Sequence, residues 1–268
     1  MDIVREIDKL INYSPKRNHL FFTMVAESEE EGGTIKPRCP TRWTCRTAAL
    51  ESVLNQYQVV MDTMQEINET TRDEYGLKVG GVLSALEKFE TFFGLRLSKR
   101  LFFAAEETSK ALQGKDMNVR DAVSYVTVLK SYFHCQRTDE AFEYFYNGTV
   151  NVARELDIGK PTLPQHRRQP KRLDDGSNPH IYSAPRDLYC QIYFEACDLL
   201  TSELTERFNQ DFLEPLVAME KLILDAANGA TSKLTWMQLG RLSLGRQKFY
   251  NADTASLNAS GSDRTCSS

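Results

Sequence analysis

Residues Thr41 to Ile67 read TRWTCRTAALESVLNQYQVVMDTMQEI and carry the strongest periodic pattern in the chain. Their apolar residues step by four, four, three, four and three positions: Ala49, Val53, Tyr57, Val60, Met64 and Ile67. Such spacing is typical of an amphipathic α-helix whose apolar stripe faces a core. The stretch therefore predicts one long helix that opens at Thr41 and packs in a bundle.

Helical spacing recurs on both sides of this stretch, and no alternating run of five or more residues predicts a strand. Local signals mark several helix starts, because Ser14 precedes Pro15, Ser183 precedes Pro185, and Thr138 precedes two acidic residues. Further apolar stripes are expected over residues 79–93, 97–112, 122–133, 142–156, 188–208 and 212–227. The sequence thus predicts an all-α fold, a multi-helix bundle.

Proline and small polar residues divide the chain into four predicted parts. A helical N-terminal lobe covers residues 1–160, and a basic, Pro-rich loop follows at 161–185. The C-terminal helices of the bundle occupy 186–230. Residues 231–268 are small and polar at their end and hold too little apolar surface to offset the entropy of ordering, so a disordered C-terminal tail is expected there.

The composition limits the classes of function. The 33 Lys and Arg residues against 37 Asp and Glu give a formal charge of -4, so any contact with nucleic acid must be local. No run of 18 apolar residues and no signal peptide is evident, so we expect no membrane association. The six scattered cysteines lack CxxC spacing, which favours reduced thiols without a metal. We expect no enzyme, no cofactor and no small-molecule substrate.

The most distinctive short motif is Arg42-Trp43, at the start of the long predicted helix. In one interpretation, Arg42 and the first-turn amides face a phosphate while the Trp43 ring stacks on an unpaired base. In the other, Trp43 is a hydrophobic anchor and Arg42 is a solvated cation. Lys36, Arg38 and Arg46 add positive charge around the motif.

A second basic cluster lies in the Pro-rich loop, where residues 166–172 read HRRQPKR. Its fixed cations are Arg167, Arg168, Lys171 and Arg172. A cluster of this density on an irregular segment suits phosphates or a nuclear-import receptor. The alternative is a solvated linker whose charge is partly matched by Asp174 and Asp175.

Three stretches, at residues 40–67, 73–116 and 172–200, resemble hAT-type transposase-derived proteins. The resemblance is greatest to the zinc finger MYM-type protein 1-like group, and it runs in order over about residues 1 to 230. Its most specific signature is Thr41-Arg42-Trp43. In that family, a large helical domain is inserted into an RNase H-like domain that carries three metal-binding acids. The resemblance implies that this chain corresponds to the helical insertion domain.

The resemblance also assigns a role to the Arg-Trp motif. In the family the tryptophan stacks on a nucleotide flipped out beside the cut, a role that carries over only to Trp43, with Arg42 beside it. The three acids do not carry over. No strand-borne Asp lies upstream of Thr41, and no Cys-Glu-Arg-Ser-Phe-like string lies downstream. Without them the two-metal mechanism of strand transfer has no site.

The sequence thus predicts a non-catalytic, truncated fragment of a domesticated hAT-type transposase, acting as a nuclear or cytoplasmic helical scaffold. DNA and protein are the expected partners, and a fragment without its former core would expose apolar helix faces for a protein partner or self-association. The alternative is a helical protein-interaction module with no nucleic-acid role. The predicted nucleic-acid-binding residues are Arg42, Trp43, Arg46, Arg167, Arg168, Lys171 and Arg172.

Overall fold

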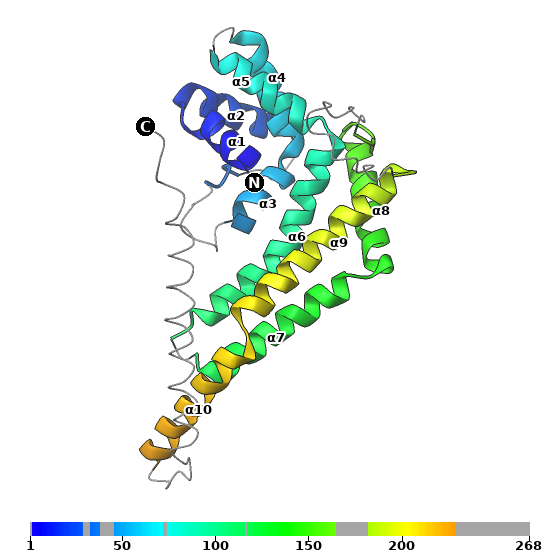
Figure 1. The fold of residues 1–268 in the computed structure, drawn as a ribbon. Helices are drawn as coiled ribbons and strands as arrows, with labels where there is room; N and C mark the ends of the chain where they lie inside the picture. Colours follow the sequence, from blue (N-terminus) through cyan, green and yellow to red (C-terminus); the bar gives the residue numbers. More distant parts are fainter. Residues whose placement is uncertain are drawn as a thin grey trace, which may run out of the picture. The chain divides into compact units, whose positions relative to one another are not determined.

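The computed structural model describes residues 2–28, 33–37, 46–71, 74–115, 117–164 and 182–228. Within these ranges the chain forms helices and no strand (Figure 1), which confirms the all-α, multi-helix class. No helix in the described ranges is long and apolar enough to cross a membrane. The tail predicted at 231–268 lies outside the described residues.

The helices follow one another in simple order. They are α1 Asp2–Asn12, α2 Pro15–Glu27, α3 Arg46–Asn55, α4 Tyr57–Thr70, α5 Glu74–Leu86, α6 Phe89–Leu112, α7 Val119–Gln136, α8 Asp139–Glu155, α9 Pro185–Arg207 and α10 Gln210–Ala227.

The chain divides into two compact units. Unit 1 comprises residues 1–117 and 124–207, and unit 2 comprises residues 118–123 and 208–268. Within unit 1, α4 packs along α5 and α3 packs along α6. The division at 161–185 that the sequence predicts falls largely on residues outside the described part, so it stays a prediction.

Aromatic rings form much of the core of unit 1. The Phe93 ring centroid lies 4.8 Å from that of Tyr189 and 5.4 Å from that of Phe145. Phe89 meets Tyr189 edge to face at 5.1 Å. Pairs of this geometry contribute about 0.5–1.5 kcal/mol beyond their burial. They join α6 to α8 and α9 in one core, to which α9 contributes the buried residues Tyr189, Tyr193 and Cys197.

The single long helix expected from Thr41 to Ile67 is wrong. The chain leaves helical geometry at Gln56, with φ -122° and ψ 33°, so α3 ends at Asn55 and α4 begins at Tyr57. The Gln56 side chain is buried and its Nε2 donates to the Ser52 carbonyl at 3.2 Å. The apolar face itself is buried as predicted: Ala49, Val53, Tyr57, Val60, Met64 and Ile67.

A second boundary also differs from the expectation. The stripe over 79–93 is divided, because Lys88 is extended (φ -90°, ψ 132°) and α6 starts at Phe89. Two consecutive carbonyls at this corner accept hydrogen bonds from elsewhere in unit 1, Leu86 from Tyr57 and Glu87 from Gly159. The break therefore occurs where distant groups bind the backbone.

The three helix starts marked by local signals are confirmed, whereas the start predicted at Thr41 lies outside the described residues. The Thr138 hydroxyl accepts a hydrogen bond from the Ala141 amide at 3.2 Å, which makes it the N-cap of α8. Helix α2 begins at Pro15 after Ser14, although the Ser14 side chain makes no capping bond. Helix α9 begins at Pro185.

Helix α8 ends at Glu155, and the chain turns over the next three residues. The Ile158 amide donates to the Ala153 carbonyl at 2.8 Å and the Asp157 amide donates to Arg154 at 3.3 Å, the two bonds of a Schellman motif. Asp157 therefore takes the left-handed conformation, with φ 50°. The amide of Gly159 donates to the Glu87 carbonyl at the α5–α6 corner at 3.0 Å.

Unit 2 contains α10 and the first residues of α7. The backbone amide of Val119 donates to Oε1 of Glu220 at 2.8 Å, which ties these two elements together. Several apolar side chains of α10 remain exposed: Leu216, Met219, Ile223 and Leu224.

Candidate functional site

Among the predicted nucleic-acid-binding residues, Arg46 lies in the described part of the chain. It is the first residue of α3 and is half-buried. The Arg42-Trp43 motif and the basic segment 166–172 both lie outside the described residues. The roles of Arg42, Trp43, Arg167, Arg168, Lys171 and Arg172 stay predictions.

A buried carboxylate from α6 holds the start of α3. Glu106 is 6% exposed, and its Oε2 accepts a hydrogen bond from the backbone amide of Thr47 at 3.1 Å. Its Oε1 lies 3.3 Å from Nζ of Lys110. A carboxylate at this end complements the positive end of the helix dipole. The Thr47 amide is thus bound by the protein and is not available to a phosphate.

The segment that leads toward the Arg-Trp motif is also fixed. The Lys36 amide donates to Oγ of Ser52 on α3 at 3.0 Å. The neighbouring Ile35 is buried, and its carbonyl accepts a hydrogen bond of 2.8 Å from the Asn12 side chain at the end of α1. Residues 33–37 are therefore held between α1 and α3.

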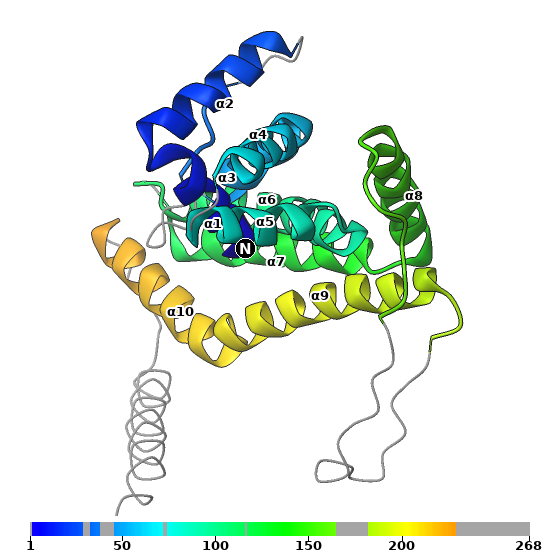
Figure 2. The same ribbon diagram turned by 90° about the horizontal axis from the view of Figure 1, so that it is seen from above.

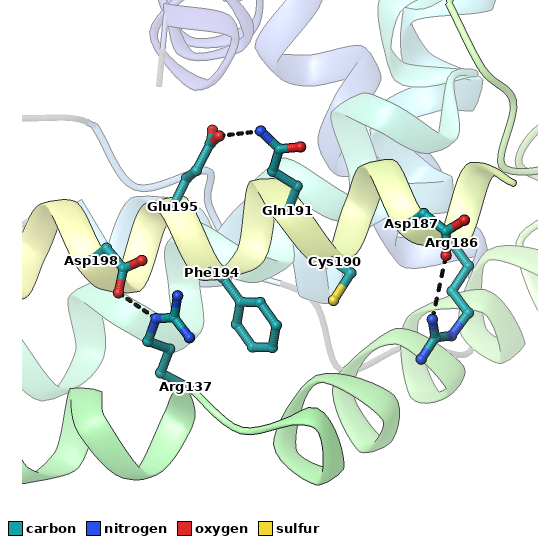
Figure 3. Close-up of a pocket in the computed structure, with 8 residues that line it drawn as sticks. All are labelled: Arg137, Arg186, Asp187, Cys190, Gln191, Phe194, Glu195 and Asp198. Carbon is teal, nitrogen blue, oxygen red and sulfur yellow. Dashed lines mark hydrogen bonds and ion pairs between the residues drawn. The ribbon is translucent and has the colours of Figure 1, made fainter. Parts of the chain in front are cut away.

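A hollow of about 360 Å³ lies between α9 and the corner that joins α7 to α8 (Figure 3). Phe194 and Cys190 point from α9 toward this corner, with an arginine near each end. A volume of this size is at the lower limit of small-ligand sites. The lining residues are Arg137, Arg186, Asp187, Cys190, Gln191, Phe194, Glu195 and Asp198.

Both arginines of the hollow are already paired. Nε of Arg137 lies 2.5 Å from Oδ1 of Asp198, and its guanidinium carbon lies 4.9 Å from the centroid of the Phe194 ring. The hydrogen bond to Asp198 raises the pKa of Arg137. At the other end, Nε of Arg186 donates to Oε1 of Glu143 at 2.7 Å. The two ion pairs link α9 to the end of α7 and to α8, and both arginine charges are balanced by a carboxylate.

The thiol in the hollow is not activated. Burial raises the pKa of Cys190, so the thiol stays protonated at neutral pH, whereas the thiolate is the reactive form. Two further lining residues are paired with each other, because Gln191 donates to Glu195 at 2.5 Å. No group of three or more His, Cys, Asp or Glu in the described ranges is placed to hold a metal ion. The described residues of the hollow therefore form ion pairs between helices, and they include no activated nucleophile.

The sequence singled out neither arginine of the hollow. Their acidic partners lie 61 and 43 residues away along the chain, so no local pattern records the pairing. The available signal was positional, because Arg137 immediately precedes the N-cap Thr138 and Arg186 follows Pro185 at the start of α9. Both arginines thus lie at helix ends, where their side chains reach acidic residues of a neighbouring helix.

The chain is similar to a human protein, the 52 kDa repressor of the inhibitor of the protein kinase. The two are 24% identical over 175 residues, which cover 62% of this chain and 23% of the relative. The chain therefore spans less than a quarter of that protein's length. No protein-family model matches the chain, and no solved structure matches it.

Proposed function

We propose that this chain is a non-catalytic fragment of a domesticated hAT-type transposase, a nuclear helical scaffold that binds DNA through its Arg-Trp motif and its basic segment. The three stretches that resemble hAT-derived proteins support the proposal. The all-helical class of the described residues agrees with the helical insertion domain that the resemblance implies.

The observation that carries this proposal is the anchored start of α3, directly after the motif. Glu106 binds the amide of Thr47, four residues beyond Trp43. A binding residue next to a fixed helix loses less conformational freedom when its ligand arrives, which favours affinity. The anchoring thus supports a binding role for Arg42 and Trp43.

Tryptophan fluorescence tests the motif, because the chain holds two tryptophans. The substitution Trp236→Phe leaves all indole emission to Trp43. Titration with single-stranded and hairpin DNA at low and high salt should then quench the emission, with an affinity that falls steeply with salt. Blue-shifted emission that DNA leaves unchanged would identify Trp43 as a core residue and refute its role.

Charge reversal tests the basic segment separately. A variant that replaces four cations with glutamate should bind DNA more weakly and with a shallower dependence on salt. The four positions are Arg167, Arg168, Lys171 and Arg172. Lys160→Glu, which reverses the charge of one exposed lysine outside this segment, should have a much smaller effect on DNA binding.

A protein-interaction module without a nucleic-acid role is the second candidate. The exposed apolar side chains of α10 favour it, because contiguous exposed apolar surface marks protein interfaces. The name of the human relative, which describes repression of an inhibitor, is consistent with action on a protein. If α10 mediates association, Ile223→Asp should lower the mass measured by light scattering at high concentration. Leu199→Asp on α9, at equal exposure, is the matched control.

A further inference from the structure

The hollow beside α9 has an apolar floor between its two ion pairs. Helices α8 and α9 meet beside the end of α7 (Figure 2), and the hollow of about 360 Å³ lies where they do. The Phe194 ring and the Cys190 thiol extend from α9 toward this corner (Figure 3), and both side chains are half-buried. A volume at the lower limit of ligand sites suits one long side chain better than a large ligand.

The hollow carries an excess of negative charge. Its lining holds two arginines, Arg137 and Arg186, and three carboxylates. Two further carboxylates, from the first two turns of α8, act on these arginines. Five carboxylates against two arginines leave three negative charges uncompensated. The five are Asp139, Glu143, Asp187, Glu195 and Asp198.

The other lysines and arginines on these helices do not offset the excess. Arg207, at the end of α9, pairs with an acid of its own helix. Lys130 on α7 and Arg154 on α8 lie seven or more residues from the charged groups of the hollow, which is about 10 Å or more along a helix. Arg100 of α6 donates to Gln136 at 2.8 Å and does not line the hollow.

The Cys190 thiol is subject to the same imbalance. Burial is the main cause that raises the pKa of this thiol, and the nearby Arg186 lowers it. Three carboxylates raise it further: Asp139, Glu143 and Asp187. Since three acids act against one cation at this position, the field in the hollow favours a cationic group and disfavours a phosphate.

Glu195 has no cationic partner in the described part of the chain. Its Oε1 accepts a hydrogen bond from Gln191 at 2.5 Å, and Gln191 in turn accepts one from the Tyr182 hydroxyl. These bonds hold an exposed carboxylate in place without neutralising it. A carboxylate offers about four acceptor positions, so Glu195 retains capacity for an ammonium or a guanidinium group.

We infer that this hollow binds a lysine- or arginine-rich segment of a partner protein, with one basic side chain along Phe194 and its charged end at Glu195. Such side chains join an apolar stem to a charged head, which matches an apolar floor with negative surroundings. A metal ion fits less well, because the described ranges contain no group of three or more His, Cys, Asp or Glu placed to hold one. The hollow shares no residue with the Arg-Trp motif or the basic segment, and its charge disfavours DNA, so the inference goes beyond the proposed function.

The test measures fluorescence anisotropy of a labelled octalysine peptide with the full chain at pH 8, where imidazole side chains are neutral. The dissociation constant should rise with salt. Asp187→Asn with Glu195→Gln removes two charges but keeps an acceptor oxygen for Ser183, which donates to Asp187 at 2.8 Å. This double variant should raise the dissociation constant by about 3-fold or more at low salt, as expected for the loss of two exposed ion pairs.

The matched control removes the same charge from α4. Asp62→Asn with Glu69→Gln alters two exposed carboxylates that each accept from a glutamine four residues earlier, as Glu195 does. It should leave octalysine binding within about 2-fold of the unaltered chain. Circular dichroism and urea unfolding confirm that both double variants fold.

A variant that gains charge tests the inference in the opposite direction. Gln191 is exposed, and Gln191→Glu adds a carboxylate to the lining, so octalysine should bind about 2-fold or more tightly. A destabilised fold would not produce this gain. The variants of the hollow should not weaken DNA binding, whereas charge reversal of the basic segment should, so the two proposals can fail separately.

Three outcomes would overturn the inference. Equal weakening in the α4 control would show that net charge alone attracts the peptide. Spermine that competes as well as unlabelled octalysine at equal charge would assign the hollow to small polyamines. Octalysine binding that appears only after charge reversal of the basic segment would show that this chain, and not a partner protein, supplies the basic side chain.

Discussion

Tyr57 and Leu86 are joined by a hydrogen bond of 2.8 Å, in which the buried phenol at the start of α4 donates to the last carbonyl of α5. Burial raises the pKa of the Tyr57 phenol, so the hydroxyl remains a donor across the physiological range. The bond closes the α4–α5 pair at the residue where α5 ends.

Tyr57→Phe should therefore lower the free energy of unfolding by about 1–2 kcal/mol, because the buried carbonyl of Leu86 loses its donor while the ring stays in place. Urea unfolding followed by circular dichroism measures the change. Tyr144→Phe removes an exposed hydroxyl and should alter stability by less than about 0.5 kcal/mol. Equal effects of the two substitutions would contradict the prediction.

Removing the carboxylate at the start of α3 should also be costly. Glu106→Ala leaves the amide of Thr47 without its acceptor, and we expect a loss of about 1–3 kcal/mol in urea unfolding. Glu106→Gln keeps an oxygen for Thr47, and the pairing that it loses, with half-exposed Lys110, is screened by solvent. The glutamine variant should therefore be the more stable of the two, and the reverse order would refute this account.

The end of α8 offers a stabilising substitution. Asp157 has φ 50°, a region that glycine occupies without strain, so Asp157→Gly should raise the melting temperature, by a gain of about 0.5–1 kcal/mol. Gly159→Ala provides the contrast. Its added Cβ would lie 3.0 Å from the Glu87 carbonyl oxygen, so this substitution should lower the melting temperature. A lower melting temperature for Asp157→Gly would show that the aspartate side chain stabilises the turn.

The cysteines should differ in reactivity. Cys197 is buried, and burial raises its pKa to about 11, so on the order of one thiol in a thousand is ionised at pH 8. Cys135 is exposed. Brief iodoacetamide treatment at pH 8, followed by peptide mass spectrometry, should label Cys135 well before Cys197. Labelling of both at one rate in the folded chain would contradict the burial of Cys197.

Alkaline pH should destabilise unit 1. Burial raises the pKa of Tyr189 and of Tyr193 to about 12, whereas unfolded tyrosines ionise near pH 10. The unfolded state therefore releases its protons first, and stability is lost as pH rises from about 10 to about 12. Urea midpoints across this range should fall less steeply for Tyr193→Phe than for the unaltered chain. Parallel slopes would refute the assignment.

Helical spacing in the sequence was enough to predict the all-α class, but it did not predict two of the helix boundaries. At Gln56 and at Lys88 the apolar stripe continues in step, so the sequence carries no stop signal. Both breaks depend on tertiary contacts, such as the bond from Tyr57 to Leu86. The starts at Pro15 and Thr138 were predictable because proline and a capping hydroxyl act within one turn.

The candidate sites also fall into two groups, those that could be predicted from the sequence and those that could not. Arg42-Trp43 and the basic segment stand out because their chemistry is contiguous in the chain. The bond from Thr47 to Glu106 spans 59 residues, and the pair Arg137–Asp198 spans 61, so only the folded chain brings these partners together.

The corner between α5 and α6 has a consequence for how the chain opens. The adjacent carbonyls of Leu86 and Glu87 bind donors from Tyr57 and Gly159, which belong to widely separated parts of the sequence. Releasing either donor disturbs the backbone that holds the other. The N-terminal helices and the end of α8 should therefore exchange their amide hydrogens in one cooperative opening, as a single foldon rather than as two that fray independently.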